Sequence, residues 1–218
     1  MIVTIDGPAG TGKSTVSRTL ADRLGFQFLN TGAMYRAVAY ACLKQELDLS
    51  DEKAVADVAH SLTIEFINNR LILGGNDVTD AIHCQSVTQS ASIVAANPAV
   101  RGRLVELQRK VGENANLVTE GRDQGTAVFP HAEYKFFLTA SAEERARRRQ
   151  RELHEKGEFI PLEELIEQQE LRDRRDESRA CSPLQPAHDA LVIDTTEMTL
   201  DEVASYLEHL VQQKLHKK

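Results

Sequence analysis

Apolar positions along the chain predict short buried strands that alternate with helices. Residues 2–5 are an apolar run, and residues 16–24 place apolar side chains on one face of a helix that Gly25 ends. Further strands are expected at residues 26–30, 116–119, 134–139 and 191–194, and a polar loop with opposed charges at residues 120–126. Helices are expected at residues 33–44, 82–96, 99–111 and 199–214, with another beginning at residue 50. This alternation predicts an α/β fold, a parallel sheet with helices on both faces.

Two segments depart from this alternation. Residues 62–79 contain short apolar runs separated by turn residues, which predicts a small antiparallel β insertion. Residues 141–156 and 162–176 predict two charged helices, with Gly157 between them and the second continuing to Arg179. Because the two helices have little apolar face, we expect a hairpin outside the core that is mobile without a ligand.

We therefore expect one domain over residues 1–218. Its parts are a core at residues 1–61, 80–140 and 183–218, the β insertion at 62–79, and an arginine-rich helical lid at 141–182.

The first strand leads directly into Gly7-Pro-Ala-Gly-Thr-Gly-Lys-Ser-Thr15, and a helical pattern follows. The spacing GxxxxGK[ST] between a strand and a helix is typical of a loop whose backbone N–H groups surround a polyphosphate. Lys13 would reach the terminal phosphates, and the Ser14 hydroxyl would bind the magnesium that accompanies ATP. The expected ATP-binding residues are Gly7, Pro8, Ala9, Gly10, Thr11, Gly12, Lys13, Ser14 and Thr15.

Composition narrows the functional classes. The 218 residues have a net charge of -7, which does not favour general nucleic-acid binding. Asp6 lies where a secretory segment would be apolar, and no apolar run approaches membrane-spanning length. We expect a cytoplasmic protein without a membrane partner. The 3 cysteines are scattered and lack metal-binding spacing, so idle or buried thiols are expected.

The phosphate-binding loop is shared by several protein classes. A regulatory GTPase needs Asn-Lys-x-Asp to read guanine, and the sequence has none. A motor or transport ATPase needs an apolar strand ending in Asp in mid-domain, whereas the strand ending at Asp194 is the last one. Transfer to a phosphate acceptor needs cations around both anions, and Arg36, Arg101 and Arg122 lie near predicted helix starts or strand ends. This arrangement favours a small-molecule kinase with a lid.

Three further motifs, in order along the chain, make the resemblance specific. They are Asn30-Thr-Gly-Ala-Met-Tyr-Arg36, Glu120-Gly-Arg-Asp-Gln-Gly-Thr-Ala-Val-Phe-Pro130 and Arg172-Asp-Arg-Arg-Asp-Glu-Ser-Arg179. With the phosphate-binding loop they closely resemble the bacterial cytidylate kinases over nearly the whole chain. The resemblance implies a P-loop nucleoside monophosphate kinase fold, and magnesium-dependent phosphoryl transfer from ATP to CMP or dCMP.

The resemblance also implies roles for individual residues. Arg36 and Arg122 would hold the acceptor phosphate. The expected base-reading residues are Thr31, Arg101, Asp123 and Arg179, and the expected pentose contacts are Ser92, Arg172 and Asp176. Cytosine carries an exocyclic amine that Asp123 can accept, whereas uracil would present a carbonyl. The expected catalytic residues are Lys13, Arg122, Arg145, Arg148 and Arg149.

The residues themselves also allow plainer interpretations. A simple ion pair within the loop could explain Arg122 and Asp123. A simple surface pair could explain Asp176 and Arg179. Thr31 and Ser92 could be helix caps. The arginines from Arg145 to Arg151 have acidic neighbours typical of a solvated helix face.

Three positions depart from the family pattern, and two other functions stay open. Thr31 stands where Ser is usual, Gln124 where an aliphatic residue is usual, and His131 where Asp is usual. None of the three removes a charge that the chemistry needs. A kinase for another acceptor, such as UMP or shikimate, and a nucleotide-dependent switch stay open. We expect a monomer.

Overall fold

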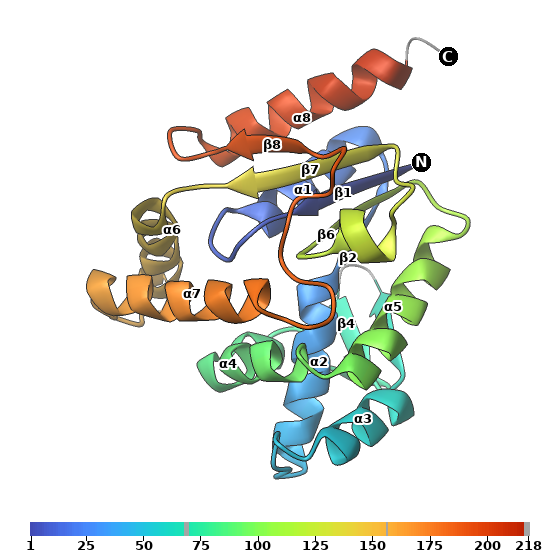
Figure 1. Cartoon of the computed structure of the whole chain (residues 1–218), viewed down its shortest axis with the longest axis vertical. Coiled ribbons are helices and arrows are strands. Elements are labelled where there is room, and N and C mark those ends of the chain that lie inside the picture. The colour runs from blue at the N-terminus through green and yellow to red at the C-terminus, as the bar shows by residue number, and fades with distance from the viewer. Residues whose placement is uncertain (68–69, 156, 216–218) are drawn as a thin grey trace. The chain divides into compact units, whose positions relative to one another are not determined.

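Five strands form one sheet in the order β2-β6-β1-β7-β8 (Figure 1). Their bounds are Gln27–Asn30 for β2, Leu117–Gly121 for β6, Ile2–Asp6 for β1, Tyr134–Thr139 for β7 and Leu191–Asp194 for β8. β1 pairs in parallel with β6 and β7, and β7 pairs in parallel with β8. Asp6 lies opposite both Gly121 and Phe137. The carboxyl ends of β1 and β6 are therefore level at one edge, and β7 extends beyond them to Thr139.

The structure is a computed structural model that describes residues 1–67, 70–155 and 157–215. Residues 68–69 of the predicted β insertion and residue 156 of the predicted lid lie outside the described residues. The chain forms two compact units, residues 1–29 with 112–218, and residues 30–111. The first unit contains the five-stranded sheet.

Helices complete the first unit. They are α1 (Lys13–Leu24), η2 (Gln124–Val128), α6 (Ala142–Glu155), α7 (Leu162–Glu177) and α8 (Leu200–Leu215). α1 and α8 pack together, and Leu20 and Leu207 join Ile5 and Leu138 of the sheet in one buried apolar cluster. The alternating apolar pattern and the observed parallel sheet agree, which confirms the predicted fold class.

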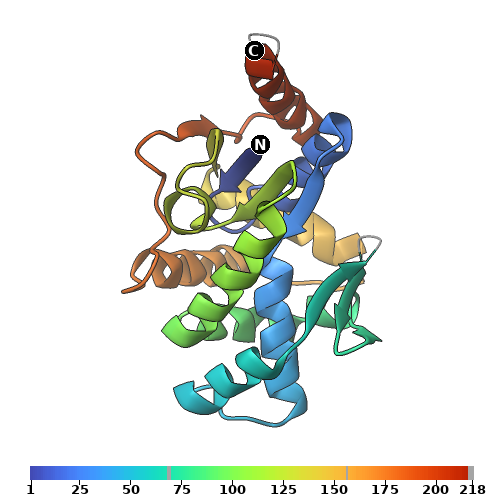
Figure 2. The same ribbon diagram turned by 90° about the vertical axis from the view of Figure 1, so that its right-hand side faces the viewer.

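The second unit contains helices and a small sheet of its own. Its helices are α2 (Thr31–Lys44), α3 (Glu52–Ser61), η1 (Ala81–His83), α4 (Gln85–Val94) and most of α5 (Pro98–Gly112). Its strands are β3 (Ile64–Ile67), β4 (Arg70–Leu73) and β5 (Asn76–Asp77), and Figure 2 shows them as a separate sheet. β4 pairs antiparallel with both neighbours, which confirms the antiparallel strands predicted within residues 62–79.

Several predicted boundaries were wrong. The loop expected at residues 120–126 begins later, because β6 pairs with β1 as far as Gly121. Residues 124–128 then form a π-helix instead of an irregular loop. α7 ends at Glu177, so Arg179 lies beyond the helix that was expected to include it. Ile82 belongs to the short η1, and α4 begins only at Gln85.

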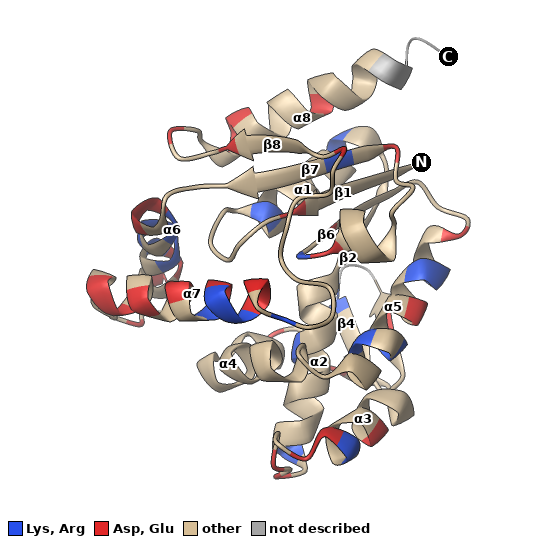
Figure 3. Ribbon diagram, in the orientation of Figure 1, with Lys and Arg blue, Asp and Glu red and all other residues tan. Residues whose placement is uncertain are grey.

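The two helices of the predicted lid, α6 and α7, have more apolar contact than the sequence suggested. α6 and α7 pack against each other, and they bury Ala146, Leu153 and Leu165 in a separate small cluster. Ile160 and Ile166 pack against it. Outside this cluster the two helices carry many acidic and basic residues, whereas β7 and β8 carry few (Figure 3). The hairpin therefore has an apolar centre and a charged exterior.

Within residues 1–67, 70–155 and 157–215, no helix is long and apolar enough to cross a bilayer.

Removal of the Leu207 side chain tests the packing of α8 on the sheet. Leu207 is fully buried, so Leu207→Ala should lower the free energy of unfolding by about 2–5 kcal/mol through lost burial and a cavity. Tyr206 is the matched control because it is 43% exposed, and Tyr206→Ala should cost about 0.5 kcal/mol or less. Urea denaturation followed by circular dichroism measures both values. Equal losses would contradict the assigned orientation of α8.

Candidate active site

The loop between β1 and α1 has a backbone that only glycine fits at two points. Gly7 has φ 143° and Gly12 has φ 86°, both in the region that favours glycine. A Cβ at Gly7 would lie 2.0 Å from the carbonyl oxygen of Leu138, and one at Gly12 would lie 2.3 Å from Leu200 Cδ2. These close approaches explain the glycines at these two places in the motif.

Lys13 lies at the start of α1 with its ammonium group folded into the loop. Its Nζ donates to the carbonyl oxygen of Pro8 at 2.5 Å and to Thr11 Oγ1 at 3.3 Å. Burial, and next the positive charge of Arg122, hold the pKa of Lys13 well below its usual value of 10.5. A phosphate placed in the loop would supply the negative charge that stabilises the protonated amine.

Ser14 has a carboxylate partner that the sequence interpretation missed. Its Oγ donates to Glu120 Oε1 at 2.9 Å, and Glu120 is 4% exposed. Glu120 lies near the end of β6, opposite Ile5. In the sequence it was assigned to a loop; extension of the apolar strand pattern by two residues would have placed it beside the phosphate-binding loop.

The donors around Ser14 suit magnesium better than a metal held by protein alone. Across residues 1–67, 70–155 and 157–215, no three His, Cys, Asp or Glu side chains are grouped to hold a metal ion. A hydroxyl and a nearby carboxylate are hard oxygen ligands, and magnesium commonly completes its shell with water and substrate phosphates. Ser14 and Glu120 therefore fit a magnesium ion that arrives with a nucleotide.

Asp176 lies between two of the predicted site arginines. Its Oδ2 accepts from Arg122 Nε at 2.8 Å, and its Oδ1 accepts from Arg179. Burial by itself raises the pKa of Asp176, but the charges of Arg122 and then Arg179 outweigh it and hold the pKa below 3.8. The Asp176–Arg179 pair is buried, so the interpretation as a surface pair was wrong. Arg122 pairs with Asp176.

Two further predicted site residues, Asp123 and Arg172, lie in the same compact unit as Asp176. Asp123 is 3% exposed and directly precedes η2, and its carbonyl oxygen accepts from the N–H groups of Ala127 and Val128. Arg172 lies on α7 one turn before Asp176 and its charge contributes to the low pKa of that carboxyl. The structure therefore brings Arg122, Arg172, Asp176 and Arg179 together.

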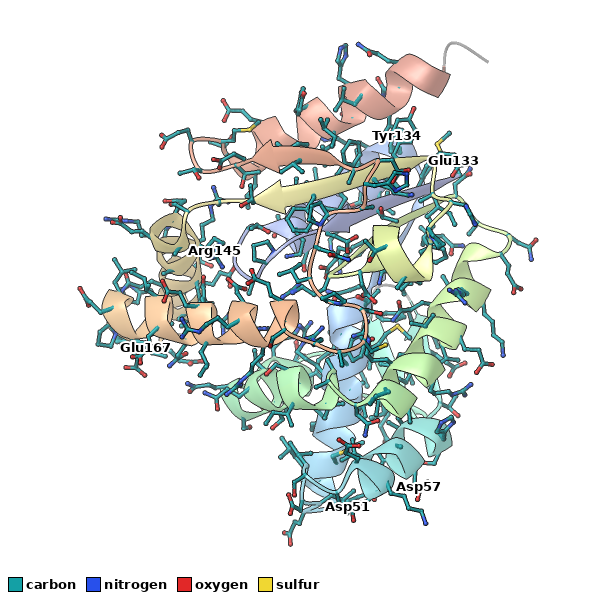
Figure 4. All side chains as sticks on the ribbon, viewed as in Figure 1. Asp51, Asp57, Glu133, Tyr134, Arg145 and Glu167 are labelled. Atoms are coloured by element: carbon teal, nitrogen blue, oxygen red, sulfur yellow. The ribbon has the colours of Figure 1, made fainter. Side chains whose placement is uncertain are left out.

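The three predicted lid arginines differ from one another. Arg145, labelled in Figure 4, donates to the carbonyl oxygen of Ala9 at 3.1 Å and to Asp173 Oδ2 at 2.5 Å. Arg148 donates to the carbonyl oxygen of Thr11 at 3.1 Å. Arg149 pairs with Glu152 on its own helix. Two of the three therefore bind the phosphate-binding loop through its backbone.

The interpretation of α6 as a solvated face holds for only part of the helix. Arg147 and Arg151 form exposed pairs with Glu143 and Glu144. The Arg145 side chain is 8% exposed and the Arg148 side chain 12% exposed. Asp173, which the sequence interpretation did not select, also accepts from the Ala9 N–H at 3.4 Å. Its pairing with Arg145 joins residues 28 apart and leaves no local sequence signal.

The other residues predicted to bind the acceptor nucleotide lie in the second unit, residues 30–111. Thr31 begins α2 but does not cap it, because the Asn30 side chain accepts from the Ala33 N–H. Ser92 lies inside α4, where its Oγ donates to the carbonyl oxygen of Gln89 at 2.9 Å, so it is not a helix cap. The interpretation of both residues as plain caps was therefore wrong.

The two arginines of this unit lie on different helices. Arg36 lies on α2, one turn after its start. Arg101 lies on α5, is 3% exposed, and its guanidinium is 5.7 Å from the centre of the Tyr35 ring on α2. Arg101 also donates to the carbonyl oxygen of Ala95 at 3.3 Å.

The parallel sheet, the glycine loop with Lys13 and Ser14, and the arginines around it define a P-loop kinase. Solved structures agree on the fold. Shikimate kinase from Bacteroides thetaiotaomicron matches with TM-score 0.51, 13% identity and coverage of 97% of this chain and 98% of that one. Shikimate kinase from Acinetobacter baumannii matches with TM-score 0.50, 16% identity and coverage of 98% and 93%.

Sequence comparisons specify the family. A family model described as cytidylate kinase matches residues 3–213. Cytidylate kinase of Caldanaerobacter subterraneus is 47% identical over 201 residues, 92% of this chain and 90% of the relative. Cytidylate kinase of Pseudomonas paraeruginosa is 45% identical over 219 residues, 98% of this chain and 96% of the relative. The chain belongs to the cytidylate kinase family, which confirms the resemblance seen in its motifs.

Removal of one partner from the buried pair of Arg145 and Asp173 should be strongly destabilising. Asp173→Ala leaves the Arg145 guanidinium buried without its carboxylate, and should lower the free energy of unfolding by about 3–5 kcal/mol. The control is Glu170→Ala on the same helix, whose pair with Arg174 is exposed and should be worth about 1 kcal/mol or less. Urea denaturation of both variants measures the difference, and similar small losses would contradict this role for Asp173.

Proposed function

We propose that this protein transfers the γ-phosphoryl group of ATP to CMP or dCMP, giving ADP and CDP or dCDP. The observation that carries the proposal is the meeting of two loops at one sheet edge. The phosphate-binding loop follows Asp6, and the loop with Arg122 and Asp123 follows Gly121, which lies opposite Asp6. Membership of the cytidylate kinase family supports CMP and dCMP as acceptors.

ATP would bind with its phosphates in the loop from Gly7 to Thr15. Lys13 would contact the terminal phosphates, and the N-terminal end of α1 would favour their negative charge. Ser14, with Glu120 behind it, would hold the magnesium that accompanies ATP. When bound, this ion supplies positive charge to the phosphate oxygens during transfer.

The acceptor nucleotide would be held by the side chains that the family resemblance assigns to it. Arg36 and Arg122 are proposed for its phosphate. The proposed base contacts are Thr31, Arg101, Asp123 and Arg179, and the proposed pentose contacts are Ser92, Arg172 and Asp176. A carboxylate at Asp123 would accept from the amine of cytosine and disfavour the carbonyl of uracil. This difference is the physical reason to expect preference for CMP over UMP.

The residues would act by positioning and by neutralising charge. The attacking oxygen already belongs to a phosphate, so no obligatory general base is assigned. Lys13, Arg122 and Arg149 would face the charge that develops during in-line transfer. Arg145 and Arg148 bind the backbone of the phosphate-binding loop, which supports a role in fixing the loop around the nucleotide.

We propose that the enzyme works as a cytoplasmic monomer on small-molecule nucleotides. The net charge of -7 does not favour general nucleic-acid binding.

Acceptor dependence tests the function directly. A coupled ADP-release assay with ATP and magnesium would compare CMP, dCMP, UMP, AMP and no acceptor. We expect release largely confined to CMP and dCMP, because a carboxylate reader favours cytosine. ADP release without an acceptor would contradict the kinase proposal and favour a nucleotide-dependent switch. Equal use of all four acceptors would contradict the proposed base contacts only.

Loss of the loop amine tests the catalytic assignment. Lys13→Ala should lower kcat by about two to three orders of magnitude, because a charge that stabilises the transition state is removed. The control is Lys110→Ala, since Lys110 lies on the surface of α5 and pairs with Glu106. Circular dichroism would verify folding of both variants. A kcat for Lys13→Ala close to that of the control would contradict the assignment.

A further inference from the structure

Asp6 is a buried carboxylate that the proposed reaction does not use. It is the last residue of β1, directly before Gly7, and it is 4% exposed. Its Oδ1 accepts from the backbone N–H of Gln124 at 2.9 Å, and its Oδ2 accepts from that of Gly125 at 2.7 Å. Both oxygens of one carboxylate therefore hold two successive amides of a segment 118 and 119 residues away.

The two amides belong to the first turn of η2, which follows Arg122 and Asp123 without a gap. The π-helix is a rare conformation that is frequent at functional sites, and it needs support from its surroundings. A Cβ at Gly125 would lie 3.0 Å from Thr4 Oγ1, so the turn lies directly against β1. The Gln124 side chain adds a hydrogen bond from Thr119 Oγ1 at 2.9 Å.

We propose that Asp6 is a positioning residue for the acceptor nucleotide, because its carboxylate fixes the turn that orients Arg122 and Asp123. This inference rests on the acceptor role proposed above for those two residues. Carboxylate bonds to backbone N–H groups are charge-assisted and directional, so they define the position of the turn better than packing alone. Since Asp6 also directly precedes the phosphate-binding loop, it fixes the turn after Arg122 and Asp123 relative to that loop.

The ionisation of Asp6 gives the proposal a second readout. Burial raises the pKa of Asp6 from 3.8 to about 7, against the opposing effect of the two amides. The facing charges are Asp123, which raises this pKa further, and Lys13, which lowers it. A protonated carboxyl loses acceptor capacity at one oxygen. The turn should therefore be held best above about pH 7 and less well as the pH falls through that value.

The test is Asp6→Asn, which keeps the shape and removes one acceptor and the charge. The KM for CMP should rise about tenfold or more, the effect of a lost charge-assisted hydrogen bond. The KM for ATP should stay within about twofold of the wild-type value. The matched control is Asp194→Asn, at the end of parallel strand β8, whose carboxylate accepts from the Thr196 N–H at 2.9 Å and is remote from Arg122 in sequence and sheet order. The control should leave both KM values unchanged.

Two comparisons separate positioning from a loss of folding. Gly125→Ala should push the turn away from Thr4 of β1, because the added Cβ would lie 3.0 Å from Thr4 Oγ1, and raise the KM for CMP in the same selective way. Between pH 6 and pH 8, about one unit either side of the Asp6 pKa, the KM for CMP should depend less on pH in Asp6→Asn than in the wild type. The ionisation of CMP itself is the same for both proteins and so does not produce this difference.

The outcomes that overturn the inference are distinct from those that overturn the function. If Arg122→Lys raises the KM for CMP but Asp6→Asn does not, the positioning role is wrong and the acceptor site stands. If Asp6→Asn raises the KM for both nucleotides equally, or only lowers the melting temperature, the positioning role is also wrong. If Arg122→Lys leaves the KM for CMP unchanged, the proposed acceptor role itself is wrong.

Discussion

The parallel register of β1 with β6 and β7 is the constraint on which the site depends. Main-chain hydrogen bonds place Asp6 opposite Gly121 and Phe137, so the loops after these strands leave the sheet at one edge. A shift of register by one residue would move every side chain of the shifted strand to the opposite face of the sheet. The same pairing therefore fixes the buried apolar cluster and brings Glu120 to Ser14.

Buried charge is concentrated around this edge, and each case has a defined partner. Lys13 is enclosed by oxygen atoms of its own loop, Arg145 by Asp173 and the carbonyl oxygen of Ala9, and Asp176 by two arginines. Burying a charge without a partner is costly, so each of these charges needs its partner in the folded protein. An enzyme that neutralises several phosphates needs such preorganised cations.

Much of the fold and part of the candidate site could be predicted from the sequence. The run from Gly7 to Thr15 identified the phosphate-binding loop, because its glycine spacing between a strand and a helix is typical of a backbone that surrounds a polyphosphate. Apolar periodicity located the strands of the sheet to within a few residues. The errors lay where periodicity ends: Glu120 was assigned to a loop, and α7 was extended past Glu177, because pairing and capping determine those limits.

The sequence by itself determined the fold class, the phosphate-binding loop and, through its motifs, the cytidylate kinase family. These features are local or periodic, so they can be read from neighbouring residues. Only the tertiary structure decided which charges are paired: Arg145 with Asp173, Arg122 with Asp176, and Asp6 with the amides of Gln124 and Gly125. These partners are 28 to 119 residues apart, and no local pattern encodes contacts that arise only when the chain has folded.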